Sequence, residues 1–509
     1  MSTETAPTRK TTSAPPEHVD VLIVGAGISG IGAACHMRRN IPHKSFAIIE
    51  ARDAIGGTWD LFRYPGIRSD SDLHTFAYEF KPWTSDNAIA DADEILAYLH
   101  ETVDEYDLRD HIHFHHRVVA AEWSSREGRW HVKLERTDTG EALEVTCSIL
   151  FSAAGYYDYE AGYRPEFPGE ENYKGVLVHP QDWPEDLDYT DKRVVVIGSG
   201  ATAITLIPAM AWDAAHVTML QRSPSYVMSL PAKDPIANGL RRVLGEKRAY
   251  RITRRINIAR QRFVYDVSKR HPNAVRQVLR FLNKIQLPRD YEVDVHFNPS
   301  YNPWDQRLCL ARSGDLFRAI RSGRASVVTD HIETFTENGI RLKSGNELEA
   351  DVIVTATGLN LLAFGGMELR VDGREVELAD ELAYKSMMLS NIPNFAFAVG
   401  YTNSSWTLKV DLVCEHLCRM IAYMDEHGYD TMVPVPDDPS IERRPLLDFS
   451  AGYVQRAIDQ FPKQGSHGPW TIEMSYAADR ERLRKGPVTD KALRFYTSEA
   501  ARSGQPVAA

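Results

Sequence analysis

The sequence has few cysteines and no long hydrophobic run. Its five cysteines are scattered over 509 residues without a CxxC pair: Cys35, Cys147, Cys309, Cys414 and Cys418. A disulfide-bonded secreted scaffold is therefore excluded, and this usage predicts a reduced, cytoplasmic chain. No uninterrupted apolar stretch reaches about 18 residues, so we expect no transmembrane helix. Residues 1–18 lack the apolar segment of a signal peptide and predict a disordered leader, and residues 501–509 predict a flexible tail.

An excess of positive charge is also missing. The chain has 70 acidic and 59 basic residues, a formal charge of −11, which argues against a nucleic-acid partner and leaves peripheral membrane contact open. Composition is otherwise that of a globular protein, with 43% hydrophobic and 25% charged residues. The length allows about three domains.

A glycine-rich turn near the N-terminus predicts a dinucleotide site. The apolar run 19–24 is followed by a GxGxxG turn and then by small and apolar residues at helical spacing, which is the pattern strand, tight turn, helix. A second apolar run, 46–49, ends in a carboxylate that can hold the two hydroxyls of an adenosine ribose. The predicted cofactor-binding residues of this unit are Gly25, Gly27, Ser29, Gly30 and Glu50.

The same unit occurs a second time in the chain. An apolar run at 193–197 precedes Gly198, Ser199, Gly200, Ala201 and Thr202, which we expect to bind a second dinucleotide. The next apolar run, 217–220, is followed by Gln221, Arg222 and Ser223 and has no carboxylate at the position of a 2′-hydroxyl. Arg222 suits a 2′-phosphate and favours NADP over NAD, with Ser223 able to add a hydroxyl contact.

The stretches between these units predict how the chain is divided. Short alternating runs at 117–151 and 332–356 each resemble an antiparallel meander that ends in small residues. The simplest fold is α/β with two Rossmann-like domains: an FAD-binding domain built from residues 19–160 and 346–500, and an NADP-binding domain at 161–345. Residues 236–290 predict a helical insertion in the second domain. The arginines of this insertion either lie on solvated helix faces or form a basic amphipathic surface that binds a membrane or a partner. They are Arg251, Arg254, Arg255, Arg260 and Arg262.

Two dinucleotide folds in one chain indicate a flavin that is reduced by a nicotinamide. A disulfide reductase would need a redox-active cysteine pair, which this chain lacks. Molecular oxygen is the remaining natural acceptor of the electrons. The sequence therefore favours a flavin monooxygenase.

A third motif carries a specific resemblance. Tyr173, Gly175, His179 and Trp183 match the FxGxxxHxxxW(P/D) fingerprint of type I Baeyer–Villiger monooxygenases, with Tyr in place of the leading Phe. Three further stretches are most similar to the ethionamide-activating subgroup of that family: GGTWDLFRYPGIRSDSD from residue 56, YNPWDQRL from residue 301 and GYTNSSWTLK from residue 400. The resemblance covers nearly the whole chain.

This resemblance implies a reaction and assigns roles. NADPH reduces FAD, oxygen then forms a C4a-peroxyflavin, and one oxygen atom is inserted beside a ketone carbonyl to give an ester or lactone, with S-oxygenation of thioethers or thioamides as a further activity. Arg307 takes the position of the cation that stabilises the peroxide and its adduct, and Asp70 that of the carboxylate that orients this arginine. Many family members have a Lys where this chain has Gln306, which shifts 2′-phosphate recognition toward Arg222. The flavin-proximal residues are Gly57, Thr58, Trp59 and Asp70, and the fingerprint residues have a conformational role.

Alternative functions and further candidate site residues remain to be considered. An N- or S-hydroxylating flavin monooxygenase and a nucleotide-binding redox sensor without turnover are the alternatives. His111, His113, His115 and His116 lie close in sequence, but no supporting carboxylate or cysteine spacing accompanies them, and we predict no metal. Asn403, Trp406 and Lys409 are pocket candidates. The identity of the ketone or sulfur substrate, and the choice between monomer and homo-oligomer, are not predicted.

Overall fold

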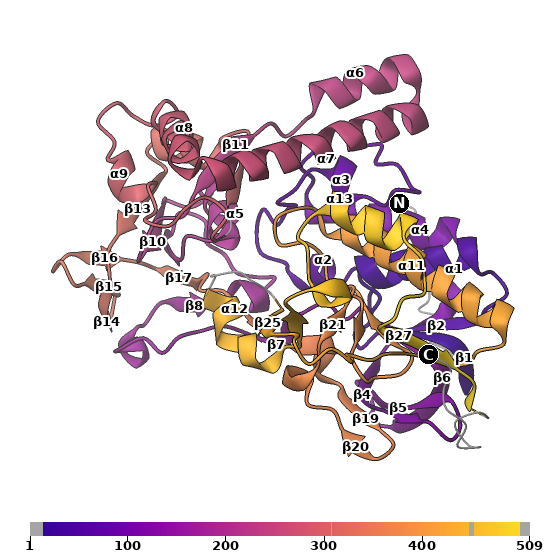
Figure 1. Cartoon of the computed structure of the whole chain (residues 1–509). Coiled ribbons are helices and arrows are strands. Elements are labelled where there is room, and N and C mark those ends of the chain that lie inside the picture. Colours follow the sequence, from indigo (N-terminus) through magenta and orange to yellow (C-terminus); the bar gives the residue numbers. More distant parts are fainter. Residues whose placement is uncertain (1–13, 307, 447–451, 499–509) are drawn as a thin grey trace, which may run out of the picture.

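The computed structural model describes residues 14–306, 308–446 and 452–498. It has two lobes, and a long helical hairpin extends from the smaller lobe over the larger one (Figure 1). Most of the predicted leader and all of the predicted tail lie outside the described residues. His18 already begins the first strand, β1 (His18–Val24), and pairs with Thr146.

The larger lobe is built on a sheet that combines strands from residues 18–152 with strands from residues 368–397. Its main strand order is β20-β19-β4-β5-β6-β1-β2-β3. The strands are β1, β2 (Phe46–Ile49), β3 (Ile112–His113), β4 (His116–Ser124), β5 (Arg129–Arg136), β6 (Ala142–Ser152), β19 (Glu368–Val371) and β20 (Arg374–Glu375). β23 (Phe395–Phe397) adds to this sheet by pairing in parallel with β6. The predicted meander at 117–151 is the antiparallel run β4-β5-β6.

Helices cover one face of this sheet and enclose its main core. α1 (Ile28–Asn40) packs against α11 (Trp406–His427), which lies almost 400 residues further along the chain. α4 (Ala92–Glu105) completes the layer. The apolar side chains of α1 and α11 are buried together with Tyr78 and Trp470 in one cluster. Burial of these surfaces from distant segments is what holds the two halves of the lobe together.

The smaller lobe contains a five-stranded parallel sheet. Its strand order is β13-β10-β9-β17-β8. The strands are β8 (Val176–Val178), β9 (Arg193–Ile197), β10 (His216–Gln221), β13 (Ala325–Thr329) and β17 (Val352–Thr355), and α5 (Ala201–Met210) and α10 (Asp315–Arg321) cover it. The two predicted Rossmann-type domains are therefore confirmed. The boundary predicted at residue 345 is wrong, because β17 hydrogen-bonds to β9 and the chain leaves this lobe only after Thr355.

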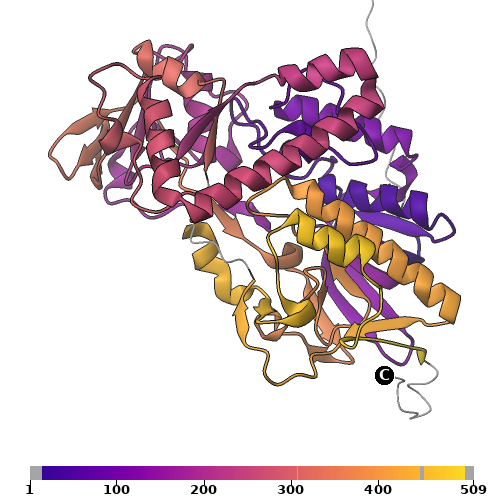
Figure 2. The ribbon, with the colours of Figure 1, turned by 45° about the horizontal axis from the view of Figure 1, so that its top comes forward.

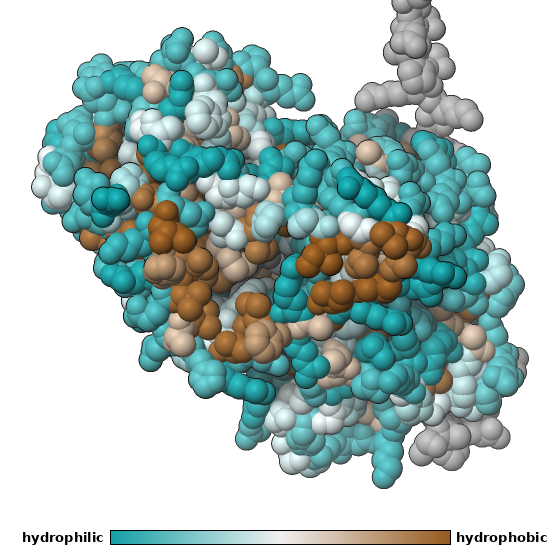
Figure 3. All heavy atoms as spheres, turned by 90° about the horizontal axis from the view of Figure 1, so that it is seen from above, coloured by the Kyte–Doolittle hydropathy of each residue, from teal (hydrophilic) through white to brown (hydrophobic). Residues whose placement is uncertain are grey.

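Three helices follow β11 (Val227–Leu230); the first two extend across the larger lobe, and the third packs against the smaller one (Figures 1 and 2). They are α6 (Pro235–Leu244), α7 (Glu246–Arg270) and α8 (Pro272–Lys284), and they correspond to the predicted insertion. α7 contacts α3 (Leu73–Phe76) in the larger lobe. The outer side of this group bears exposed apolar side chains (Figure 3). Among the described residues, no helix combines the length and the apolarity needed to cross a bilayer.

Candidate active site

The first glycine turn brings β1, α1 and β6 into close contact. Gly25 has φ +101°, and a Cβ there would lie 2.9 Å from the carbonyl oxygen of Ala153. A Cβ on Gly30 would lie 1.9 Å from the carbonyl oxygen of Gly25, so only glycine lets α1 begin this close to the strand. Gly27 has open space on its Cβ side, with its nearest neighbour, Gly57, 3.7 Å away. The backbone can therefore approach a pyrophosphate at the N-terminus of α1.

Glu50 is held in place at the end of β2. Only 7% of its surface is exposed. Its Oε2 accepts a hydrogen bond of 2.7 Å from the amide of Ala26, and its Oε1 accepts one of 2.9 Å from the amide of Arg52. Burial raises the pKa of this carboxyl, while the two amides act in the opposite direction. Each oxygen keeps a second lone pair for a ribose hydroxyl.

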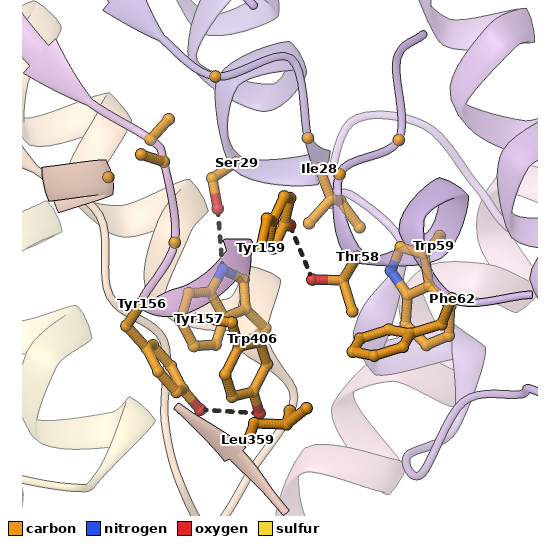
Figure 4. Close-up of a pocket in the computed structure, with 18 of the residues that line it drawn as sticks. Ile28, Ser29, Thr58, Trp59, Phe62, Tyr156, Tyr157, Tyr159, Leu359 and Trp406 are labelled. Carbon is orange, nitrogen blue, oxygen red and sulfur yellow. Dashed lines mark hydrogen bonds between the residues drawn. The ribbon is translucent and has the colours of Figure 1, made fainter. Parts of the chain in front are cut away.

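A cavity of about 480 Å³ extends from this turn to the start of the second unit. It is lined by ten of the predicted cofactor-binding residues: Gly25, Gly27, Ser29, Glu50, Gly57, Thr58, Trp59, Asp70, Ala201 and Thr202. In Figure 4, Ser29 accepts a hydrogen bond of 2.8 Å from the indole of Trp406, and the hydroxyls of Thr58 and Tyr159 lie 3.1 Å apart. The cavity is therefore shared between the two nucleotide units.

The second glycine turn repeats the geometry of the first with one difference. Gly198 has φ +141°, and a Cβ there would lie 2.3 Å from the carbonyl oxygen of Ala356. Gly200 meets nothing within 4 Å. The residue that corresponds to Gly30 of the first turn is Ala203, which is fully buried. The second turn therefore has room for a methyl group at this position. The open space at Gly200, at the N-terminus of α5, is suited to a phosphate.

The residues predicted for the 2′-phosphate lie beyond β10. Arg222 is exposed and forms no ion pair with another described residue. The hydroxyl of Ser199 donates to the carbonyl of Ser223 at 3.1 Å, which joins the ends of β9 and β10. Gln306 is half-buried. Arg307, the predicted catalytic cation, lies outside the described residues.

The fingerprint residues lie along the edge strand β8 and do not line the cavity. The hydroxyl of Tyr173 donates to the carbonyl of Ala350 at 3.0 Å, and a Cβ on Gly175 would overlap that tyrosine. His179 accepts the amide of Gln181 at Nδ1. Its Nε2 donates to the carbonyl of Gly358. Burial lowers the pKa of this imidazole, which is neutral in this arrangement.

Trp183 packs, partly buried, against the core of the smaller lobe. The fingerprint therefore connects β8 with Gly358, at the point where the chain returns to the larger lobe. β7 (Tyr157–Gly162) and β18 (Leu359–Leu361) pair beside it as the two connections between the lobes. A conformational role for this segment stays a prediction.

A flavin-binding monooxygenase-like family model matches residues 19–399, which include both glycine turns and the fingerprint. The chain belongs to this family of flavin-binding monooxygenases. The family predicted from the two nucleotide motifs is thereby confirmed.

Named relatives of this flavin monooxygenase extend over nearly its full length. It is 54% identical to the FAD-containing monooxygenase EthA of Mycobacterium tuberculosis over 480 residues, which cover 94% of this chain and 98% of that one. It is 48% identical to the probable FAD-binding monooxygenase AlmA of Acinetobacter baylyi over 483 residues, 94% of this chain and 96% of that one.

Solved structures share its fold. An oxidized steroid monooxygenase bound to NADP has a TM-score of 0.73 at 24% identity, covering 94% of this chain and 100% of that one. The open structure of cyclohexanone monooxygenase also has a TM-score of 0.73, at 21% identity, covering 95% of this chain and 100% of that one. At these identities the likeness shows the fold alone.

Two of the three pocket candidates lie away from the shared cavity of this monooxygenase. Trp406 lines it, but Lys409 is buried and forms an ion pair of 2.7 Å with Asp479. Burial lowers the pKa of this lysine. Asn403 lines a second cavity of about 610 Å³ beside α7, and Ser404 lines both cavities. A sequence pattern could not separate these residues, because only the packing of α11 shows which side chains face inward.

Sequence reasoning missed Arg68, which lines the shared cavity. Its side chain is 4% exposed, and one terminal nitrogen contacts the carboxylate of Asp315 at 2.6 Å. The other terminal nitrogen has no hydrogen-bond partner within the described part of the chain. A buried, partly unsatisfied guanidinium facing a cavity is an anchor for an anionic or carbonyl group. The signal available in the sequence was its place two residues before Asp70.

Two of the four clustered histidines, His111 and His116, have structural surroundings that differ from those of a metal site. His111 stacks on Phe46 with ring centroids 4.4 Å apart, and its Nδ1 lies 3.0 Å from the carbonyl of Phe46. Burial lowers the pKa of His116. In the part of the chain that the structure describes, no group of three or more His, Cys, Asp or Glu side chains is arranged to hold a metal.

Proposed function

We propose that this flavin monooxygenase is an NADPH-dependent Baeyer–Villiger enzyme that contains FAD. The overall reaction joins a ketone, O₂, NADPH and a proton to give an ester or lactone, water and NADP⁺. FAD, when bound, supplies electron transfer from the nicotinamide to oxygen. Oxygenation of thioethers or thioamides is a further activity that we propose for the same site. The peroxyflavin route implied by the resemblance stays a prediction.

The observation that carries the proposal is the shared cavity. Ser29, Glu50 and Thr58 of the first unit face the same space as Ala201 and Thr202 of the second. A nicotinamide bound at α5 and a flavin bound at α1 would both open onto this cavity, which is the arrangement that hydride transfer between two cofactors needs. The names of the relatives support FAD, and the NADP bound to the steroid monooxygenase supports the nicotinamide.

The residues of this chain fit the two cofactors. Glu50 offers free lone pairs to a ribose, and Gly27 leaves the phosphate path open. Gly200 leaves the corresponding space at the second turn, and Arg222, which forms no ion pair with another described residue, offers its guanidinium to a 2′-phosphate. This arrangement predicts a preference for NADPH over NADH that depends on Arg222.

Asp70 and Arg307 are the residues proposed to act on the reacting oxygen. Asp70 lines the shared cavity and is exposed to it. A fixed cation at Arg307 would stabilise negative charge on oxygen at any working pH, because guanidinium stays protonated. The carboxylate of Asp70 would orient that cation.

The Arg307→Ala variant tests this assignment. We expect it to retain FAD and NADPH-dependent flavin reduction, measured anaerobically by absorbance, and to lose at least 100-fold in ester formation, the size of effect expected for removing one oxyanion-stabilising group. Arg307→Lys is the matched control and should recover part of the product, because it restores a positive charge. Wild-type product yield from Arg307→Ala would remove this residue from the mechanism.

Product analysis distinguishes the alternatives. Incubation with NADPH, air and an aliphatic ketone or a thioether should yield an ester from the ketone. Sulfoxide with no ester would favour an S-hydroxylating monooxygenase. NADPH oxidation that neither substrate accelerates, with no oxygenated product, would favour the redox sensor.

A further inference from the structure

The helices α6, α7 and α8 have one face fixed to the protein. The hydroxyl of Tyr250 donates to the carbonyl of Tyr78 at 2.8 Å. Arg254 donates to the carbonyl of Ala77 at 2.7 Å, and Asn257 donates to the carboxylate of Asp72 at 2.9 Å. These contacts lie on one side of α7 and orient it. Its opposite side therefore faces away from the larger lobe.

This outward side is apolar. Of the 14 large hydrophobic side chains that are exposed in the described chain, 11 lie between residues 236 and 285. They are Ile236, Val243, Leu244, Ile252, Ile256, Phe263, Val264, Val278, Phe281, Leu282 and Ile285. Phe263 and Phe281 are 68% and 60% exposed. Figure 3 shows such side chains gathered on the face seen from above, where Figure 1 draws these helices. An apolar concentration of this kind marks an interaction surface.

The same segment is strongly basic. Residues 235–284 contain 14 Arg or Lys and two acidic residues, a net charge of +12 in a chain whose total is −11. Several exposed cations form no ion pair with another described residue: Arg242, Lys247, Arg248, Arg255, Arg260, Arg270 and Lys284. The rest of the chain therefore carries −23, so the excess positive charge is concentrated in this segment.

We propose that the outer face of α6, α7 and α8 docks the enzyme on an anionic phospholipid bilayer. Helices that present apolar side chains between uncommitted cations bind in the plane of the headgroups, because the apolar groups reach the acyl boundary while the cations meet the lipid phosphates. A second copy of this chain is a poorer occupant, since a symmetric contact would bring two faces rich in exposed, unpaired cations together. Nucleic acid offers the phosphates but no partner for the exposed aliphatic side chains.

The test is co-sedimentation of the FAD-loaded enzyme with vesicles of phosphatidylcholine alone or mixed with phosphatidylglycerol. We expect sedimentation with the anionic vesicles and little with the neutral ones, and we expect it to weaken as salt is raised. Phe263→Ser combined with Phe281→Ser should lower the partition coefficient at least about tenfold, because it removes two large apolar groups. Arg248→Glu combined with Arg255→Glu should do the same.

Matched controls lie on other surfaces. Val176→Ser removes an apolar side chain that is 45% exposed, and Arg374→Glu reverses an exposed cation on the β19–β20 hairpin. Both should sediment like the wild type. NADPH oxidation in buffer reports that every variant is folded. Vesicle binding is measured without turnover, so its result is independent of whether the proposed reaction is correct.

Three outcomes would overturn the proposal. The first is equal sedimentation, or none, with both kinds of vesicle. The second is the same loss of binding in the controls as in the helix variants. The third is an oligomeric state that the Phe263 and Phe281 substitutions dissolve while vesicles are not bound, which would make a second copy the occupant.

Discussion

His416 should make the larger lobe sensitive to acid. It lies on α11 and is completely buried. Its Nδ1 donates to the carbonyl of Leu483 at 2.7 Å, and its Nε2 has no hydrogen-bond partner among the described residues. Burial, and then the nearby charge of Lys385, lower its pKa from 6.5 to about 3. A proton on Nε2 would create a buried cation, and the nearby carboxylate of Asp490 offsets only part of the cost of burying it.

The direction and size of the effect follow from linkage. Between pH 6.5 and about 3 the unfolded chain takes up a proton at His416 that the folded chain refuses, so stability is complete above this window and falls as the pH is lowered through it. At about 1.4 kcal/mol for each pH unit, the whole window corresponds to about 5 kcal/mol. Between pH 7 and pH 5 the loss from this one group is about 2 kcal/mol.

His416→Asn isolates this contribution. The Asn amide can still donate to the Leu483 carbonyl but does not titrate. Urea unfolding, followed by release of flavin fluorescence, should show about 2 kcal/mol less destabilisation between pH 7 and pH 5 in this variant than in the wild type. The matched control is His427→Asn on the same helix, whose histidine is exposed and bonds the carbonyl of Tyr423. Equal acid destabilisation in His416→Asn and wild type would refute the assignment.

Three further predictions concern the cofactor turns and the core. Gly30→Ala should abolish FAD retention in the purified protein, because its Cβ has no room. Gly200→Ala, where a Cβ meets open space, should keep FAD and raise the KM for NADPH at least about tenfold. Normal FAD content in Gly30→Ala would contradict this prediction. Trp406→Phe removes the hydrogen bond to Ser29, worth about 1 kcal/mol, and should weaken FAD binding about fivefold in a titration of the apoprotein. Lys409→Met leaves its buried carboxylate partner without its cation and should destabilise the larger lobe by about 3–5 kcal/mol in urea unfolding; an unchanged midpoint would show that the ion pair contributes nothing.

The parts that could be predicted from the sequence are those that depend on neighbours in the chain. Gly25, Gly30 and Glu50 occur at spacings that a strand, a turn and a helix require, and the structure places them at those points. The same strand, turn and helix spacing predicted the second turn at Gly198. Ten predicted residues consequently meet in one cavity.

The parts that could not be predicted depend on contacts between distant segments. Arg68 is buried because Asp315, 247 positions away, receives its guanidinium. Lys409 turns inward because Asp479 packs beneath α11. β17 joins the smaller lobe through hydrogen bonds to β9, which no local pattern distinguishes from a strand of the larger sheet. Each of these outcomes is decided by tertiary packing rather than by local propensity.

The interleaving of the two lobes sets an order for folding during synthesis. All five strands of the smaller sheet lie between Val176 and Thr355, so they leave the ribosome before β23 and α11 have been made. The larger lobe must wait until those segments emerge, because until then the last residues of β6, 150–152, lack the strand β23 and α1 lacks its helical partner. The flavin-binding lobe therefore closes last, and a nascent chain stalled after Thr355 would contain a complete nicotinamide-type sheet beside an unfinished flavin site.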